Sequence, residues 1–344
     1  MASKSLGIDP SYAATEDCAK LVEISSGYWL PRALHVAADL GIADHIADTP
    51  RTAASLAQDI GADPGALDRL MRLLASEGVF TRQNGLYAHN PISRLLRTDH
   101  PQSMRAYVQL LGMPLIWNSW TDLTQAVKTA WPITGDIFTY MAQHPDEASL
   151  FDRGMKSKAQ SAIPPALNAY DFSQFHCISD IGGGLGHLLR AILHRCPGTK
   201  GVLFDQPHVI ERAKADGTID GRLSLDAGDF FTDPLPQSDA YLLMEVLHDW
   251  SDEQCTRILQ QIRTAAHNDS KLLIIETVLP DEKAWADGRA QHFGHHLDIN
   301  MLVVTGGRER SPEQFRELLS SASWRLNRVL PTPSAYSVVE AVTA

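Results

Sequence analysis

The clearest pattern along the chain is the alternation of short apolar runs with helix-forming segments in the C-terminal half. The apolar runs have the length of strands and cover residues 177–181, 201–204, 223–225, 241–244 and 272–275. Strands that alternate with helices predict a parallel, doubly wound α/β sheet, whose ligands bind beyond the carboxyl ends of the strands. Two further strands, residues 325–330 and 336–342, are joined by a proline-containing turn and predict an antiparallel edge.

The N-terminal part of the chain has a helical pattern followed by a hairpin. Apolar positions recur at helical spacing over residues 21–40, and Gly41 ends that pattern. Two more helices are predicted over residues 52–58 and 64–77. The Asn84-Gly85 pair supplies the positive φ angles of a tight turn between two short strands. Three helices and a hairpin predict a winged-helix arrangement.

The charge of this module argues against its best-known use, the binding of DNA. The helix over residues 64–77 would enter the major groove, yet its only cations are Arg69 and Arg72, and three acids surround them. The whole chain has a formal net charge of −11. Because binding to a phosphate backbone depends on Lys and Arg, we expect a structural or dimerising module and no nucleic-acid partner. A winged-helix regulator remains an alternative that site-specific DNA binding would support.

The 344-residue length is typical of two domains. Between residues 100 and 168 the chain is helical and rich in bulky apolar side chains, which we expect to pack between the domains and in part to line a pocket. We therefore place a helical winged-helix and lid domain at residues 1–165 and an α/β domain at residues 166–344.

Cysteine usage and hydropathy predict a soluble cytoplasmic protein. The four cysteines lack C-x-x-C pairing, so neither a disulfide framework nor a zinc site is expected. The first residues are polar, and the chain contains no apolar run of the ~18 residues that a membrane span requires.

A glycine turn follows the first strand of the C-terminal half. Asp180 precedes Gly182, Gly184 and Gly186, which are evenly spaced, and a helix-forming segment follows. Glycines allow positive φ and close approach of a ligand to the free N–H groups of a helix start. The dinucleotide fingerprint G-x-G-x-x-G has a different spacing, which disfavours a nicotinamide-dependent oxidoreductase. The D-x-G-x-G-x-G pattern instead resembles motif I of class I S-adenosylmethionine-dependent methyltransferases, which implies a methyl-donor site.

Acidic residues also end the next two strands. Asp205 closes the second strand, where a carboxylate can accept both hydroxyls of a ribose. Asp229 follows the third strand and can accept the adenine amino group, while Phe230 packs on the ring. Their joint occurrence at consecutive strand ends supports a nucleoside site along the crevice.

Five ordered motifs then make the resemblance specific. They cover residues 180–186, 204–210, 228–231, 246–253 and 306–311. In order and spacing they resemble the caffeic-acid-type small-molecule O-methyltransferases, whose bacterial members modify aromatic natural products. The resemblance extends over nearly the whole chain. It implies a Rossmann-like, mostly parallel seven-stranded sheet and a winged-helix domain that forms a homodimer.

The resemblance also implies roles for three residues near the fourth and fifth strands. His248 matches the general base, and Glu276 and Glu309 match the two carboxylates that flank it. A phenol has a pKa near 10 and a histidine near 6.5, so a neutral imidazole within reach can remove the hydroxyl proton as the oxygen attacks. Nearby carboxylates would orient the ring and stabilise the imidazolium. No metal is required.

The remaining cofactor positions are Gln206, beside Asp205, and Met244, four residues before His248. Plant members of the family carry a lysine at the position of Met244. A thioether cannot donate a hydrogen bond, so we expect that contact to be lost or replaced.

Positions that match substrate-lining residues of the family are Phe151, Met155 and Met301. Five neighbours have weaker support, namely Met113, Trp117, His295, Asn300 and Thr305. Packing without substrate contact is an equally good interpretation for each of them.

The sequence thus predicts a dimeric S-adenosylmethionine-dependent O-methyltransferase that acts on a hydroxyl of an aromatic small molecule of secondary metabolism. A methyltransferase that acts at nitrogen or carbon would use the same fold and stays an alternative.

Overall fold

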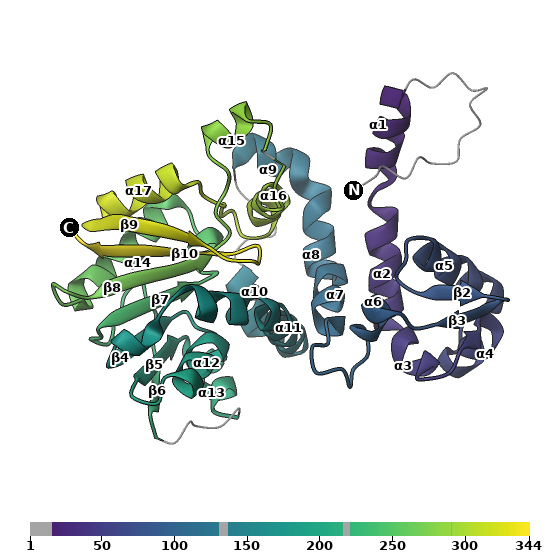
Figure 1. Ribbon diagram of the computed structural model, residues 1–344, viewed down its shortest axis with the longest axis horizontal. Coiled ribbons are helices and arrows are strands. Elements are labelled where there is room, and N and C mark those ends of the chain that lie inside the picture. The colour runs from purple at the N-terminus through teal and green to yellow at the C-terminus, as the bar shows by residue number, and fades with distance from the viewer. Residues whose placement is uncertain (1–15, 131–136, 216–220, 290) are drawn as a thin grey trace. The chain divides into compact units, whose positions relative to one another are not determined.

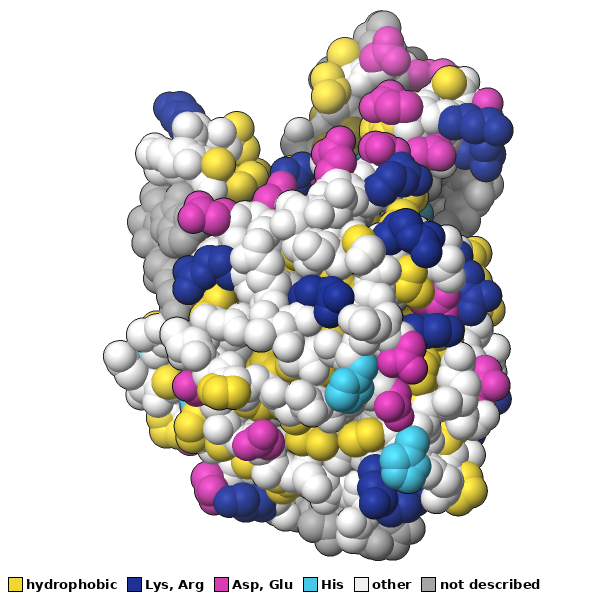
Figure 2. Space-filling model, turned by 90° about the vertical axis from the view of Figure 1, so that its left-hand side faces the viewer, with side chains coloured by type: hydrophobic (Ala, Val, Ile, Leu, Met, Phe, Trp, Pro, Cys, Tyr) yellow, Lys and Arg dark blue, Asp and Glu magenta, His cyan; other side chains and the backbone are white. Residues whose placement is uncertain are grey.

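The computed structural model describes residues 16–130, 137–215, 221–289 and 291–344 (Figure 1). Its internal packing divides the chain into two compact units, Met1–Met113 and Pro114–Ala344. None of the helices in the described ranges is long and apolar enough to cross a membrane. Acidic and basic side chains are interspersed on the face that Figure 2 shows.

The N-terminal unit consists of helices around a small three-stranded sheet. Its helices are α1 Glu16–Ser26, α2 Trp29–Asp39, α3 Ile42–Ile46, α4 Ala53–Ile60, α5 Pro64–Ser76, α6 Pro91–Arg94 and α7 Arg105–Gly112. Its strands are β1 Arg51–Thr52, β2 Thr81–Gln83 and β3 Leu86–Ala88, in the order β1-β3-β2. The helices predicted over residues 52–58 and 64–77 and the hairpin are therefore present, and β1 adds a third strand to the wing.

Local sequence signals explain most boundaries of this unit. Asp63 caps α5 through its carboxylate and Pro64 occupies the first turn. Asn84 and Gly85 have φ angles of 50° and 77°, as the predicted hairpin turn requires. The single helix predicted over residues 21–40 is wrong, because the chain breaks into α1 and α2 around Gly27.

Helix α5, the recognition helix in a DNA-binding interpretation, packs Leu67, Met71 and Leu74 into the core. One of its two cations, Arg72, forms an ion pair with Asp68 on the preceding turn at 3.1 Å. Part of the small positive charge of this helix is thus neutralised within the helix itself.

The C-terminal unit combines a seven-stranded sheet with helices. Its strands are β4 Cys177–Ile181, β5 Lys200–Asp205, β6 Leu223–Ala227, β7 Ala240–Met244, β8 Lys271–Glu276, β9 Trp324–Pro331 and β10 Ser337–Thr343. Its α-helices are α8 Pro114–Ser119, α9 Leu123–Thr129, α10 Ile137–Gln143, α11 Pro145–Ala169, α12 His187–Arg195, α13 Pro207–Ala215, α14 Asp252–Ala265, α15 Glu282–Ala286, α16 Gly294–Val304 and α17 Pro312–Ser321. Short 3-10 helices are η1 Trp120–Asp122, η2 Phe172–Gln174 and η3 Leu247–Asp249.

The strand order is β6-β5-β4-β7-β8-β10-β9, and the first five strands are parallel. Strand β10 pairs antiparallel with both β8 and β9. The predicted doubly wound sheet with an antiparallel edge is confirmed. Its carboxyl ends gather the segments after β4, β5, β6, β7 and β8 along one edge of the sheet.

Two apolar cores cover the two faces of the sheet. Helices α11, α12 and α13 pack on one face, and α14 and α17 pack on the other. Strand β7 shows the alternation clearly, since Leu242 enters the first core whereas Tyr241 and Leu243 enter the second. The sheet is therefore buried on both faces, as expected for parallel strands.

The division after Met113 differs from the domain boundary expected after residue 165. The difference lies in helices α8 to α11, which pack within the C-terminal unit: α11 contacts α12 and β10, and α8 and α9 contact α16. Ala162, Ile163 and Ala166 of α11 are buried in the core on one face of the sheet.

Candidate active site

The glycine turn lies directly after β4, at the carboxyl edge of the sheet. Gly182, Gly184 and Gly186 have φ angles of 67°, 60° and 76°, a region that L-residues with side chains rarely adopt. A Cβ at Gly183 would come within 2.5 Å of the Asp180 carboxylate, so the turn lies directly over that side chain. At Gly184 a Cβ would meet nothing within 4 Å, which leaves the backbone accessible to a ligand.

Asp180 itself is buried, and its Oδ1 accepts no hydrogen bond from the described residues. Burial, helped by the charge of Asp205, raises the pKa of Asp180 to about 7. A buried carboxylate oxygen without a donor beneath a glycine turn fits a ligand that carries hydrogen-bond donors.

Asp205 at the end of β5 links the second strand to this turn. Its Oδ2 accepts the N–H of Gly184 at 2.8 Å, and its Oδ1 accepts the N–H of Gln206 at 2.7 Å. Burial raises the pKa of Asp205 to about 6. The side chain of Gln206 is exposed at the start of α13.

An aromatic cluster lies beside the turn. A Cβ at Gly182 would be 3.4 Å from Phe230, which places that ring against the glycine turn. Trp250 contacts Phe230 and Phe231 edge to face and stacks on Phe138 of α10 at a centroid distance of 5.6 Å. Asp229, which precedes Phe230, is exposed and accepts the N–H of Phe231.

His248 lies on η3, which two residues separate from the end of β7, and it is 4% exposed. Three consecutive backbone N–H groups of this turn, from Val246, Leu247 and His248, donate to Oε1 of Glu276 at 3.2, 2.7 and 3.2 Å. Glu276 therefore holds the backbone of the turn and does not bond the imidazole. Burial raises the pKa of Glu276 to about 7.

Glu309 bonds the imidazole directly. Nδ1 of His248 lies 2.8 Å from its Oε1, and because a carboxylate only accepts, Nδ1 carries the proton. Nε2 is then the ring atom that can accept a proton, and it lies 3.8 Å from Oδ1 of Asp249. The backbone N–H of Glu309 donates to Asp298 of α16 at 2.8 Å.

Several acids surround the imidazole. Burial lowers the pKa of His248, but the charges of Asp249, Glu309 and Glu276 outweigh burial and raise the pKa to about 10. The ring is therefore a much stronger base than a histidine in water.

The loop before α17 brings Glu309 to the η3 turn. A Cβ at Gly307 would lie 1.9 Å from the carbonyl oxygen of His248, so only glycine permits this approach. The N–H of Arg308 donates to that same carbonyl at 2.8 Å. The two backbone segments are thus in direct contact.

Arg310 joins the same two segments through its side chain, which is 1% exposed. Its guanidinium donates to the carbonyl oxygens of Leu247 at 2.9 Å and Trp250 at 3.1 Å, the residues on either side of His248 and Asp249. It also forms two bonds with Asp252, at 3.0 and 2.7 Å.

The predicted acceptor residues lie in three places. Phe151 and Met155 are half-buried on α11, and Met113 is buried at the last position of the N-terminal unit. Trp117 lies on α8, and α16 carries His295, Asn300 and Met301. Helix α16 packs against α8 and η1, where the Trp120 indole donates to Asn300 at 3.2 Å. The Thr305 hydroxyl is bonded to Met301 and Gly307 at the end of α16.

Met244 is half-buried at the end of β7 and packs against the core.

Sequence reasoning missed the contributions of Asp249, Gly307 and Arg310. Asp249 and Arg310 adjoin the predicted residues His248 and Glu309, and Gly307 lies two residues before Glu309, so the His-Asp and Gly-Arg-Glu-Arg runs were the available signals. Within the described residues, no group of three His, Cys, Asp or Glu side chains could hold a metal ion.

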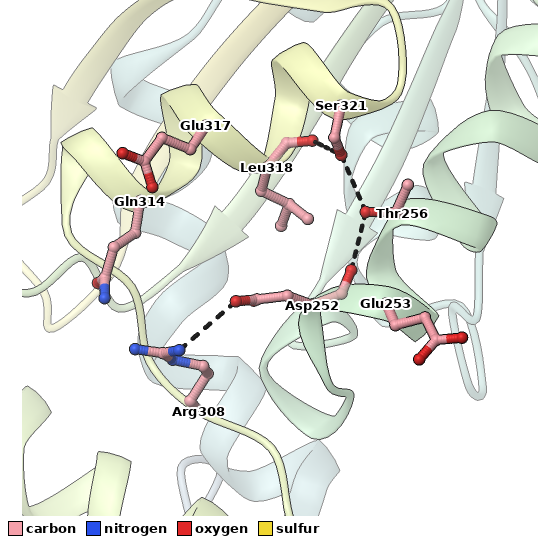
Figure 3. A pocket seen from close by; sticks show the side chains of 8 residues that line it. All are labelled: Asp252, Glu253, Thr256, Arg308, Gln314, Glu317, Leu318 and Ser321. Carbon is pink, nitrogen blue, oxygen red and sulfur yellow. Dashed lines mark hydrogen bonds and ion pairs between the residues drawn. The ribbon is translucent and has the colours of Figure 1, made fainter.

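A polar groove borders this arrangement, between α14 and α17 (Figure 3). Its lining residues are Asp252, Glu253, Thr256, Arg308, Gln314, Glu317, Leu318 and Ser321. Arg308 lies 3.5 Å from Asp252, and the Thr256 and Ser321 hydroxyls are 2.9 Å apart. The predicted site residues lie elsewhere, so this groove is not the predicted acceptor site.

Comparison with known proteins agrees with this geometry. Residues 22–99 match the family described as the O-methyltransferase dimerisation domain, and residues 120–325 match the O-methyltransferase domain. Phenazine O-methyltransferase of Lysobacter antibioticus is 38% identical over 330 residues, which cover 93% of this chain and 95% of that protein.

Two other relatives widen the comparison. The crystal structure of human N-acetylserotonin methyltransferase with S-adenosylmethionine matches with a TM-score of 0.88 and 27% identity, over 97% of this chain and 99% of that chain. 8-Amino-8-demethylriboflavin N,N-dimethyltransferase of Streptomyces davaonensis is 33% identical over 90% of that protein and 89% of this chain.

The order of the strands, the glycine turn and both family matches lead to one assignment. The chain belongs to the S-adenosylmethionine-dependent small-molecule O-methyltransferases that carry an N-terminal dimerisation domain.

Proposed function

We propose that this enzyme methylates a hydroxyl group of an aromatic small molecule in secondary metabolism, with His248 as the general base. The observation that carries the proposal is the buried His248–Glu309 pair, which leaves Nε2 as the proton acceptor at the carboxyl end of β7. The names of relatives, a phenazine O-methyltransferase, a 6-O-methyltransferase of mitomycin biosynthesis and a 3-amino-4-hydroxybenzoate 4-O-methyltransferase, support an aromatic substrate.

The cofactor residues fit S-adenosylmethionine, which supplies an electrophilic methyl group on sulfur. Asp205 would accept the ribose hydroxyls, Asp229 the adenine amino group, and Phe230 would pack on the base. The glycine turn from Gly182 to Gly186 would allow close approach of the donor to the backbone. These roles are assigned by position and by the contacts described above.

His248 would then act on the acceptor. Nε2 takes the hydroxyl proton as the oxygen attacks, and Glu309 stabilises the imidazolium through Nδ1. Glu276 holds the turn that carries the ring. Phe151, Met155 and Met301, together with the α16 residues, would line the acceptor, whose alignment with the methyl group can lower the barrier by roughly 7–11 kcal/mol.

A homodimer completes the proposal. Helix α1 buries none of its residues, and Leu21 and Ile24 are 65% and 64% exposed. Tyr28 and Trp29 continue this apolar surface beyond Gly27. Such a contiguous apolar surface on a segment that matches a dimerisation domain supports pairing with a second copy.

The test is a screen of phenolic acceptors with isotopically labelled methyl donor, followed by identification of the methylated atom by NMR. An O-methyl aromatic product is expected. An N-methyl product would favour the second candidate, N-methylation, which the riboflavin-type relative supports. Absence of transfer to every aromatic acceptor would contradict the proposal.

A further inference from the structure

A buried ion pair next to the His248 turn has no part in the roles given so far. Lys158 of α11 donates to Oε1 of Glu245, the residue after β7, and the Tyr336 hydroxyl donates to the same oxygen at 2.9 Å. The Lys158 and Glu245 side chains are only 13% and 5% exposed. Three separate elements therefore converge on one carboxylate.

This arrangement is costly for the fold. Removing two charges from water offsets most of the attraction between them, so a buried ion pair is weak evidence for stability. Glu245 also has a φ angle of 54°, a left-handed conformation that is unfavourable for a residue with a side chain. Strain and buried charge at the same residue point to function.

The pair lies in line with the nucleoside residues. In the sheet order, Asp205 ends β5, the glycine turn follows β4, and Glu245 follows β7. Neighbouring strands are about 4.8 Å apart, so the ends of β5 and β7 are roughly 10 Å apart.

Helix α11 runs along this edge. Asp152 in its first half pairs with Arg212 of α13 at 2.6 Å, and Lys158, nearly two turns later, reaches Glu245. The helix thus connects the side of the crevice near Asp205 with the end of β7.

A methyl donor bound by its ribose at Asp205 would extend its amino-acid end across the glycine turn toward β7. That end is a zwitterion, with an α-carboxylate and an α-ammonium group. We propose that Lys158 and Glu245 bind this zwitterion, Lys158 through the carboxylate and Glu245 through the ammonium. The inference rests on the proposed function and adds residues for the donor.

The charges suit this role. Burial opposes ionisation of Glu245, but Lys158 and His248 hold the pKa of that carboxyl below its usual value, so it keeps its charge. The Tyr336 hydroxyl fixes the carboxylate from the other side.

The experiment compares two ligands by calorimetry on the full-length protein. S-Adenosylhomocysteine has the amino-acid end, and 5′-methylthioadenosine keeps the nucleoside and the sulfur but lacks it. In Lys158→Met and Glu245→Gln the affinity for the first ligand should fall about 10- to 100-fold, as expected for a lost charged hydrogen bond. The affinity for 5′-methylthioadenosine should change less than threefold. Lys156→Met, an exposed lysine on the same helix, is the matched control and should leave both affinities unchanged.

Two results would overturn the inference. If the variants lose equal affinity for both ligands, the pair has a packing role. If the acceptor KM changes and donor affinity does not, the pair acts on the acceptor, because Lys158 shares a helix face with Phe151 and Met155. Should Lys158→Met fail to fold, the near-isosteric Glu245→Gln carries the same comparison. A wild-type protein that binds neither ligand would contradict the proposed function itself.

Discussion

At the scale of single residues, the acids around His248 determine its chemistry. An isolated histidine would be too weak a base to take a proton from a phenol without cost, because their pKa values differ by ~3.5. Asp249, Glu309 and Glu276 bring the pKa of His248 to about 10, close to that of a phenol. Proton transfer between the two groups is then nearly balanced.

Replacement of His248 by alanine should reduce kcat by roughly 100- to 10,000-fold, the usual contribution of a general base. Donor affinity should change little, because the ring bonds Glu309 and not the glycine turn. Steady-state kinetics and calorimetry with S-adenosylhomocysteine measure the two effects. An unchanged kcat would remove His248 from the base role.

The pH profile should reflect the raised pKa of His248. Only the neutral ring accepts a proton, so a higher pKa moves the rising limb of kcat/KM to higher pH. With an ordinary phenol as acceptor, wild-type kcat/KM should rise through the neutral range and not level off near pH ~6.5.

Glu309→Gln removes a negative charge beside His248. It should shift the rising limb of the kcat/KM profile to lower pH and should also lower kcat. Rate profiles of the wild type and the variant from pH ~6 to ~10 test this expectation. Superimposable limbs would show that Glu309 does not set the basicity of the ring.

At the scale of elements, the site depends on two short segments that lack regular hydrogen bonding to the sheet. The η3 turn carries the base, and the loop before α17 carries its partner. Gly307 and Arg310 hold the two segments together through the backbone of the η3 turn, and Glu276 fixes that turn from β8. These contacts bring His248 and Glu309 together in addition to the bond between their side chains.

Arg310→Met should separate these segments. It removes the buried guanidinium bonds to the carbonyls of Leu247 and Trp250 and to Asp252, so we expect a loss of about 3 kcal/mol in the free energy of unfolding and a large fall in kcat. Arg308→Met removes the same charge from an exposed position that also faces Asp252, and should cost less than ~0.5 kcal/mol. Denaturant unfolding and kinetics of both variants provide the comparison. Equal losses of stability and kcat in the two variants would mean that they result from the missing positive charge and not from the bonds to the carbonyls.

Local patterns predicted the strands, the hairpin and the glycine turn well, because each depends on neighbouring residues. The break at Gly27 was missed because apolar spacing continues across it. The Lys158–Glu245 pair joins residues 87 positions apart, and no periodicity or motif reports such a contact. The roles of Glu276 and Glu309 also required coordinates, since sequence does not tell which carboxylate bonds the ring and which bonds the backbone.

At the scale of the whole molecule, the apolar surface of α1 implies that the working unit contains two chains. Leu21→Asp combined with Ile24→Asp should convert a dimer into monomers, because burial of a charge in an apolar interface is unfavourable. Light scattering coupled to size-exclusion chromatography measures the mass. Val127→Asp, at a residue of the C-terminal unit that is 65% exposed, is the control and should leave the mass unchanged. A monomeric wild type would contradict the proposed assembly.

The place of β10 in the sheet has a consequence for biosynthesis. This strand lies between β8 and β9 although it is the last of the three to be synthesised. Until residue 343 has left the ribosome, β8 presents an unpaired apolar edge and β9 has no neighbour in the sheet. Such edges can pair with other chains, so the nascent protein is prone to aggregation until β10 has emerged.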